Sequence, residues 1–212
     1  MNSSAALVPL WLDLACVGVG AFQGALYAIV NQRFDLVGVS IVALVTGLGG
    51  GTVRDLLLAN GRPATMQDKY LATVAVAIIA AVALGRWHQH GRKPVLVLDS
   101  IALGLFAVAG TYKALMLGTS SAVAVTLGLV TAIGGGILRD LVCRVTPAVF
   151  KGGPLYATAA VVGSITFLLL FRQTSLALNT CAIIAAAMTL LLRVLSLRFR
   201  WYLSPAVKSL GE

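Results

Sequence analysis

The sequence contains two arginine–aspartate pairs whose residue types and spacing could contribute to an ion pathway. Each pair follows three consecutive glycines, in the segments Gly49–Leu56 and Gly134–Leu141. A glycine inside a helix costs about 1 kcal/mol relative to alanine, so two triple runs indicate that bare backbone is needed at both places. The candidates for an ion pathway are therefore Gly49, Gly50, Gly51, Gly134, Gly135, Gly136, Arg54, Asp55, Arg139 and Asp140.

The local structure of the glycine runs decides what they can do. A dinucleotide-binding loop is disfavoured, because that fingerprint needs a soluble strand before the glycines and an acidic residue about 20 positions further on. We expect instead that the two helices bend or unwind at their glycines, which is tolerated where a helix lines a cavity or is buried in protein. Backbone carbonyls freed in this way could coordinate a passing cation.

The partners of the arginines are a separate question. Neighbouring residues on a helix do not face each other, so Arg54 should not pair easily with Asp55. We expect Arg54 to reach towards Asp140 instead, and Arg139 to reach towards Asp55. Two roles stay open for these residues: satisfied buried ion pairs at helix ends, or a gate that sets the polarity of a narrow, water-filled passage.

Three further charges lie inside apolar runs and are secondary candidates: Asp13, Asp99 and Lys113. A charge within a membrane is rare and by default is functional or paired. Asp13 is either a cap near the interface or part of the pathway. Lys113 is expected to snorkel to the outer interface, with a contribution to the pathway as the alternative.

The composition identifies a membrane as the setting of these residues. Apolar residues make up 59% of the 212 residues and charged residues only 11%, against about 25% charged in soluble domains. This length has room for about seven spans of ~20 residues and no separate soluble domain. We expect a single all-α membrane domain over residues 1–212. Its spans are predicted at about 8–30, 36–58, 70–84, 95–117, 122–142, 155–171 and 176–197, the first being retained because it lacks the marks of a signal peptide.

The chain is built as a repeat. The glycine runs and the Arg-Asp pairs recur at one constant offset, whereas the offset from Asp13 to Asp99, like that from Tyr70 to Tyr156, is one position longer. Repeat one therefore covers about 8–86 and repeat two about 95–171, with an extra helix at about 176–197. Because each repeat has three spans, the second must enter the membrane from the opposite side, as an inverted repeat does. That arrangement brings the second and fifth spans together near the midplane.

The distribution of charge predicts how the chain is oriented in the membrane and disfavours nucleic acid as a partner. The net charge is +9, but the basic residues are scattered over loops and span ends without the aromatic-interleaved basic face of a nucleic-acid groove. With the N-terminus outside, ten Lys and Arg residues lie on the inside and three on the outside. The positive-inside rule then predicts a cytoplasmic C-terminus and insertion in the cytoplasmic (inner) membrane.

Catalysis and metal binding find little support. No serine or cysteine nucleophile has a nearby base, so we expect no enzyme and no cofactor. The loop residues His88 and His90 lack a third ligand close in sequence, which disfavours a metal site. The cysteines Cys16, Cys143 and Cys181 stand alone, without a CxxC motif, and are expected to serve packing.

Tandem GGGxxRD motifs, one in each half of a three-plus-three-plus-one pattern of spans, resemble the prokaryotic branch of the trimeric intracellular cation channel family. Proteins with this domain have also been described as glycine transporters. The resemblance covers nearly the whole chain. It implies a homotrimer in which each subunit has its own pore around kinked second and fifth spans. Monovalent cations would pass, with potassium favoured and sodium a further candidate, and membrane lipid would surround the protein.

The resemblance also assigns positions within the pore. By match of motif, Gly49–Gly51 and Gly134–Gly136 would be the kinks that line it, with the Arg-Asp pairs beside them. Animal members have a lysine-bearing motif at the second kink and bind an inositol lipid there, whereas this chain has Gly134–Gly136.

Two other functions are compatible with a repeat of this kind. A secondary transporter of a small solute such as glycine also fits an inverted repeat, but seven short spans leave little to rock, and no aromatic and polar pocket is evident. A membrane scaffold whose glycines serve only packing would leave the four intramembrane aspartates unexplained. We therefore expect a cation channel, with the transporter as the alternative.

Overall fold

The computed structural model describes residues 8–59, 63, 65, 67–85, 93–151 and 154–201. These residues form seven α-helices and no strand, as the sequence predicts. The helices are α1 (Leu10–Tyr27), α2 (Leu36–Leu57), α3 (Asp68–Gly85), α4 (Lys93–Met116), α5 (Ser121–Val142), α6 (Ala157–Gln173) and α7 (Leu178–Phe199). A π-helical turn, η1 (Ala28–Gln32), extends α1, and a short 3-10 turn, η3 (Ala148–Phe150), precedes α6.

The helix starts and the turns repeat with the sequence. The Asp35 side chain caps α2 by accepting a hydrogen bond from the Gly38 amide at 2.8 Å, and Ser120, at the equivalent position of repeat two, caps α5 in the same way. Such caps satisfy amides that have no partner within the helix. Left-handed backbone occurs at Arg33 and its equivalent Gly118, and again at Ala59 and its equivalent Arg144. The duplication therefore extends from the motifs to the backbone geometry.

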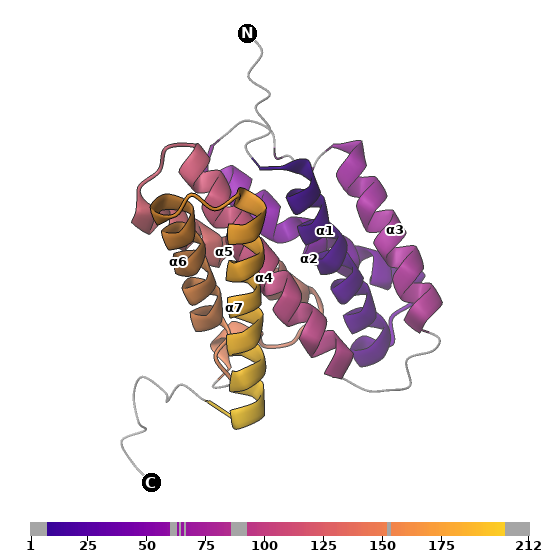
Figure 1. Ribbon diagram of the computed structural model, residues 1–212. Helices are drawn as coiled ribbons and strands as arrows, with labels where there is room; N and C mark the ends of the chain where they lie inside the picture. The colour runs from indigo at the N-terminus through magenta and orange to yellow at the C-terminus, as the bar shows by residue number, and fades with distance from the viewer. Residues whose placement is uncertain are drawn as a thin grey trace, which may run out of the picture.

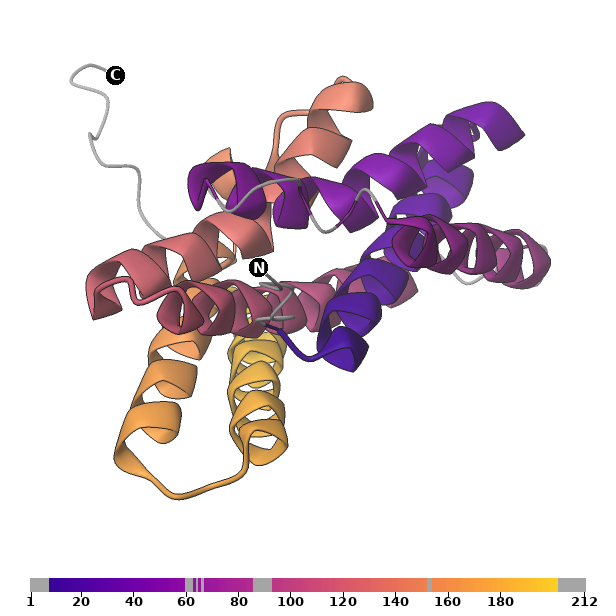
Figure 2. The same ribbon diagram turned by 90° about the horizontal axis from the view of Figure 1, so that it is seen from above.

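Two three-helix repeats and one additional helix make up the bundle. Figure 1 places α1–α3 on one side of the molecule and α6 and α7 on the other, with α4 and α5 between them. Helix α4 packs on α1, α5, α6 and α7, and α2 packs on both α1 and α5. Seen from above in Figure 2, α6 and α7 form a pair that stands apart from the first repeat. The contact between α2 and α5 thus lies where the two repeats meet.

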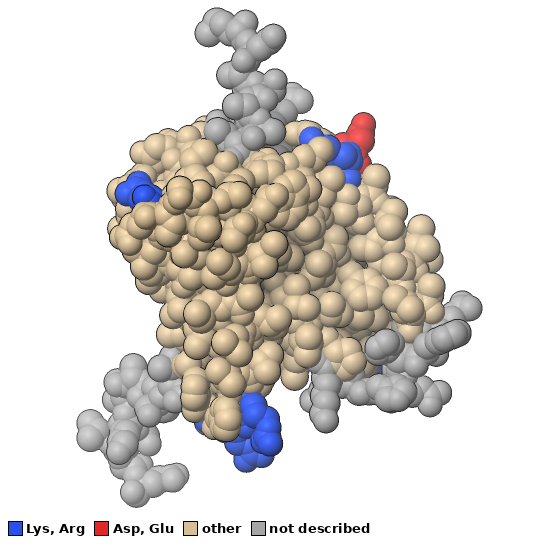
Figure 3. Space-filling model, viewed as in Figure 1, with Lys and Arg blue, Asp and Glu red and all other residues tan. Residues whose placement is uncertain are grey.

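The outer surface is that of a membrane protein. Five helices, α1 with η1, α2, α4, α5 and α7, are long and apolar enough to cross a membrane, and α6 is a shorter apolar helix. On the face drawn in Figure 3, charged atoms appear only towards the two ends of the molecule. An apolar belt of this extent is far larger than the patches that soluble proteins expose.

Candidate functional site

The two glycine runs face each other where α2 crosses α5. A side chain on Gly50 would strike the carbonyl oxygen of Thr131, and one on Gly135 would strike the carbonyl oxygen of Thr46. Gly50 and Gly135 are equivalent positions of the two repeats, as are Thr46 and Thr131. The contact is therefore self-complementary, like the contact across a two-fold axis. Only residues without a side chain allow two helices to approach this closely.

Of the two forms expected at the glycines, a bend or an unwound segment, unwinding is wrong, and a bend stays a prediction. Both α2 and α5 are continuous α-helix through their glycines. Their carbonyls remain within the helical hydrogen-bond pattern and are not freed for a cation. Glycines in a helix can either favour unwinding or allow a second helix to pack closely. Here they allow two intact helices to pack closely.

The first cluster of charges joins α1, α2 and α4 near the C-terminal end of α2. Arg54 Nη1 lies 3.2 Å from Asp13 Oδ1, and Arg54 Nε lies 2.7 Å from Asp55 Oδ1. Lys113 Nζ lies 2.8 Å from the same Asp55 oxygen, and the Tyr70 hydroxyl donates a hydrogen bond to Asp13 Oδ2 at 3.1 Å. Arg54 is 1% exposed and Asp55 2%, so the cluster is buried.

The second cluster joins α4 and α5 at the opposite end of the bundle. Arg139 Nη1 lies 2.9 Å from Asp99 Oδ1, and Arg139 Nη2 lies 2.8 Å from Asp140 Oδ1. The amide of Ala148 donates a hydrogen bond to Asp140 Oδ2 at 3.0 Å, which ties η3 to the end of α5. The ring centre of Tyr27 lies 4.5 Å from the Arg139 guanidinium carbon. Arg139 and Asp140 are both buried.

The predicted exchange of partners between the two Arg-Asp pairs is wrong. Among the described residues, the salt bridges of Arg54 and Arg139 join each arginine to the aspartate next to it, and none joins it to the aspartate of the other motif. Helical spacing separates adjacent Cβ atoms, but an arginine is long enough to bring its guanidinium back to the next carboxylate. Its Nη1 atom then extends to the aspartate on the neighbouring helix.

The contacts of Lys113 and Asp13 show which of the roles expected for these two side chains they do not have. Lys113 does not snorkel to the outer interface: it is 7% exposed and bound to Asp55. Asp13 does not cap α1, whose N-cap is Pro9, and it is paired with Arg54. The Asp55 carboxylate attracts the ammonium group inward, because an unpaired buried charge would be far more costly than a paired one.

A small cavity lies between the glycine crossing and the second cluster. Its volume is about 10 Å³, room for roughly one water molecule. Its polar lining comes from Gln23, Thr46, Asp99 and Tyr156, beside Gly135 and Gly136. Sequence reasoning missed Gln23 and Tyr27. The signals were a single amide within an apolar run, and the correspondence of Tyr27 with Lys113 in the other repeat.

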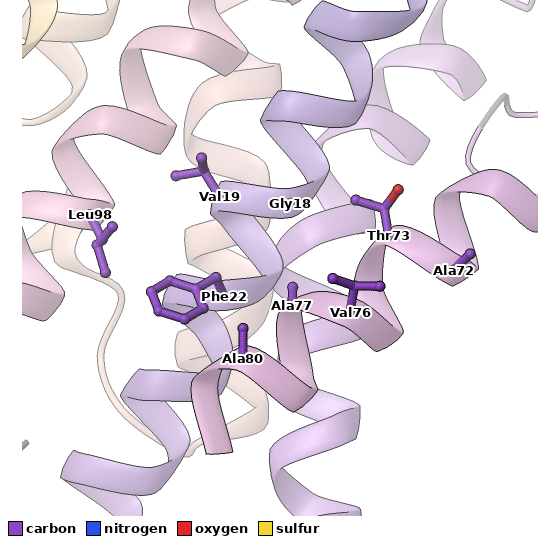
Figure 4. Close-up of a pocket in the computed structure, with 9 residues that line it drawn as sticks. All are labelled: Gly18, Val19, Phe22, Ala72, Thr73, Val76, Ala77, Ala80 and Leu98. Atoms are coloured by element: carbon purple, nitrogen blue, oxygen red, sulfur yellow. The ribbon is translucent and has the colours of Figure 1, made fainter. Parts of the chain in front are cut away.

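An open apolar groove runs along α1 and α3. Its volume is about 510 Å³, and Figure 4 shows Gly18, Phe22, Thr73, Ala77 and Leu98 among its lining residues. In the second repeat the position equivalent to Gly18 is Gly104, and there α7 fills the space: a side chain on Gly104 would meet the Ala186 carbonyl oxygen at 2.9 Å. The groove in repeat one therefore corresponds to the surface of repeat two on which α7 packs.

The remaining reactive side chains form no further site in the described part of the chain. No group of three or more His, Cys, Asp and Glu residues that could hold a metal occurs there. His88 and His90 lie outside the described residues. Cys16, Cys143 and Cys181 are free and buried, as packing residues are.

A helical bundle of this kind, with duplicated halves and buried charges at both ends of a glycine crossing, defines a repeat-built integral membrane protein. The chain belongs to the family described as "Glycine transporter", whose sequence pattern matches residues 10–86 and again 96–172. It is 33% identical over 204 residues to the "UPF0126 inner membrane protein YadS" of Escherichia coli (strain K12), covering 95% of this chain and 97% of that protein. A "UPF0126 membrane protein" of Deinococcus radiodurans is 38% identical over 156 residues, 73% of this chain and 72% of the relative.

Solved structures with the same fold carry the other description of this family. A structure described as "Structural basis for conductance through TRIC cation channels" has a TM-score of 0.80 and 29% identity, covering 95% of this chain and 98% of that one. The trimeric intracellular cation channel orthologue from Rhodobacter sphaeroides has a TM-score of 0.81 and 30% identity, covering 91% and 98%. The resemblance that the tandem motifs indicate is thereby confirmed.

Proposed function

We propose that the protein is a cation channel that favours potassium, with one ion pathway in each subunit. The observation that carries this proposal is the crossing of α2 and α5 at their glycines, with a buried cluster of charges on each side of it. Intramembrane charges mark ion pathways in membrane proteins. Two solved relatives with nearly complete coverage are named cation channels, which supports the same activity here.

The pathway would run from the first cluster through the crossing to the second. On this route Gly49–Gly51 and Gly134–Gly136 form the constriction, and Arg54, Asp55, Arg139 and Asp140 are its charged flanks. On this proposal the arrangement described here would not conduct, because the cavity at the crossing has a volume of about 10 Å³, room for roughly one water molecule.

We further propose that the single membrane domain sits in the cytoplasmic membrane with its N-terminus outside and its C-terminus inside. The excess of Lys and Arg on the segments that would then face the cytoplasm supports this orientation. No catalytic role is part of the proposal.

The alternative, a transporter of a small solute, takes its support from the family description alone. A bound amino acid needs a pocket of polar groups several times larger than the cavity at the crossing. The 510 Å³ groove is lined almost wholly by apolar side chains and so offers nothing to an ammonium or carboxylate group. The channel is therefore the better supported function.

The deciding experiment compares conduction with uptake in one preparation. Purified protein in planar bilayers with asymmetric potassium chloride should give unitary currents that reverse towards the potassium equilibrium potential. Liposomes of the same preparation with a glycine gradient should show no saturable uptake. Glycine uptake without unitary currents would contradict the channel and establish the transporter.

The homotrimer is proposed to form with the groove between α1 and α3 facing a neighbouring subunit. In repeat two, α7 packs on the equivalent surface. In a membrane, an apolar groove lined by a glycine is suited to the packing of another helix. A helix of a second copy would therefore complete repeat one.

Filling this groove tests the assembly. Val76→Trp should convert the trimer to monomers because this exposed side chain lines the groove and an indole there occupies the space reserved for the neighbouring helix, whereas the helices of the subunit itself stay in place. Mass measurement in detergent reports the change. Val76→Ile, which adds little volume, is the matched control. A tryptophan variant that remains trimeric would contradict the assignment of this face.

A further inference from the structure

The additional helix α7 buries a cation beside the second cluster. Arg193 is 5% exposed, and its guanidinium carbon lies 4.7 Å from the ring centre of Tyr156. Its Nη1 atom donates hydrogen bonds to the carbonyls of Pro154 and Leu155 at 2.9 and 3.2 Å. Its Nε atom is buried without a hydrogen-bond partner among the described residues. Arg193 thus binds the segment that leads into α6 and is not fully used by it.

The charge of Arg193 acts on a carboxylate that it does not contact. Within the described part of the chain, no salt bridge joins Arg193 to an aspartate. Coulombic attraction to Asp99 nevertheless favours the charged form of its guanidinium. Tyr156 contacts Arg193 and lines the same cavity as Asp99. In a buried site an opposite charge nearby greatly reduces the cost of an ionised group, so Arg193 compensates the second cluster.

With Arg193 counted, both clusters are neutral, and each holds two aspartates and two basic residues. The first contains Asp13, Asp55, Arg54 and Lys113, and the second contains Asp99, Asp140, Arg139 and Arg193. The two clusters obtain their second cation from different helices. In the first it comes from α4 of the other repeat, and in the second it comes from α7, which lies outside both repeats.

The sequence of repeat one explains why the second cluster needs α7. Tyr27 and Lys113 are related by the same offset as Asp13 and Asp99, so they are equivalent positions. Tyr27 gives Arg139 an aromatic face at 4.5 Å and adds no cation. Without a lysine at this place, the second cluster would keep one uncompensated carboxylate. Helix α7 supplies the missing positive charge.

We propose that Arg193 is a positioning residue of the second cluster, which balances the charge of its carboxylates and holds Tyr156 against the glycine run of α5. A Cβ atom on Gly136 would lie 3.0 Å from the Tyr156 hydroxyl oxygen, so this ring is in close contact with the glycine run. Through Tyr156, α7 fixes one wall of the cavity beside the crossing. The charge balance is independent of what the protein conducts, whereas the link to an ion pathway rests on the proposed function.

Substitutions at Tyr27 test the charge balance. A lysine at this position is expected to reach Asp140, as its equivalent Lys113 reaches Asp55 at 2.8 Å. In the wild-type background Tyr27→Lys adds an excess cation, and its melting temperature should be about 5 °C below that of the neutral variant Tyr27→Met. In an Arg193→Met background the same lysine restores neutrality, and the order of the two variants should reverse by a similar amount. Thermal unfolding of purified protein, followed by size-exclusion chromatography, measures all four combinations.

Two further backgrounds separate charge from the loss of a contact. The Ser196 hydroxyl of α7 accepts a hydrogen bond from the Leu155 amide at 2.6 Å and carries no charge. Ser196→Ala therefore loosens the segment that Arg193 also binds, but Tyr27→Lys should stay less stable than Tyr27→Met in this background. Arg193→Lys keeps the positive charge and should preserve the same order. Only loss of the charge is expected to reverse it.

The outcomes distinguish this inference from the proposed function. An order of Tyr27→Lys and Tyr27→Met that is the same with and without Arg193 overturns the inference, whatever the bilayer recordings show. If Arg193→Met gives no folded protein, the wild-type background decides, because a lysine more stable than methionine there would mean that Arg193 does not balance the cluster. Absence of unitary currents overturns the channel and leaves these melting temperatures unaffected.

Discussion

Gly50→Ala is expected to abolish conduction and to lower the melting temperature by about 5 °C, corresponding to ~1–3 kcal/mol of overpacking. The added methyl group overlaps the carbonyl oxygen of Thr131, which belongs to a helix and has no free end that can move aside. Helices α2 and α5 must then separate along the whole crossing. Bilayer recordings and thermal unfolding followed by size-exclusion chromatography measure the two effects.

A matched variant distinguishes this contact from a general effect of removing a glycine. A methyl group on Gly18 meets only the Thr73 Cγ2 atom at 3.4 Å, an ordinary contact. Gly18→Ala should therefore keep the unitary conductance, because each subunit is proposed to have its own pathway, and should not destabilise the fold of the subunit, because alanine favours helix. Equal behaviour of the two alanine variants would show that the close approach of α2 and α5 has no part in folding or conduction.

Arg139→Met is expected to be the most destabilising single change in the charged clusters, and Arg54→Met clearly less so. Removing one partner of a buried ion pair costs about 3–5 kcal/mol because a charge is left uncompensated. Without Arg139, both Asp99 and Asp140 lose their salt bridge. Without Arg54, Asp55 still has Lys113 and Asp13 still has the Tyr70 hydroxyl.

The yield of folded protein and its melting temperature measure this difference. Arg139→Met should give little folded protein, whereas Arg54→Met should fold with a melting temperature lowered by several degrees. Arg198→Met, at an exposed position on α7, is the control for loss of an arginine as such. Equal losses at Arg54 and Arg139 would mean that Lys113 does not support Asp55.

The helices and the repeat could be predicted from the sequence because each depends on a local pattern. Apolar runs near the length of a membrane crossing fix where a helix lies, and the nearly constant offset between matching motifs fixes which helices correspond. The candidate residues could be found for the same reason, since charges such as Asp55 stand out within apolar runs. All of these signals are contained in a short stretch of chain or in the comparison of two stretches.

The contacts of those residues could not be predicted, because they depend on how the helices pack. Three glycines are compatible with unwinding and with close approach, and the presence of a second glycine helix at the crossing decides between them. Whether Lys113 reaches the interface or Asp55 depends on which helix lies beside it. The pairing of Arg54 with its neighbour depends on Asp13 being held at the right distance by α1.

The π-helical turn η1 indicates how the two repeats came to differ in length. Six positions separate Tyr27 from Arg33, but only five separate the equivalent residues Lys113 and Gly118, so repeat one holds one more residue here. A π-helical turn accommodates an extra residue within a helix without altering what precedes or follows it. Ala28–Gln32 is thus an insertion taken up as a bulge. The halves of a duplicated gene could diverge in length at this point while the crossing of their glycine helices kept its alignment.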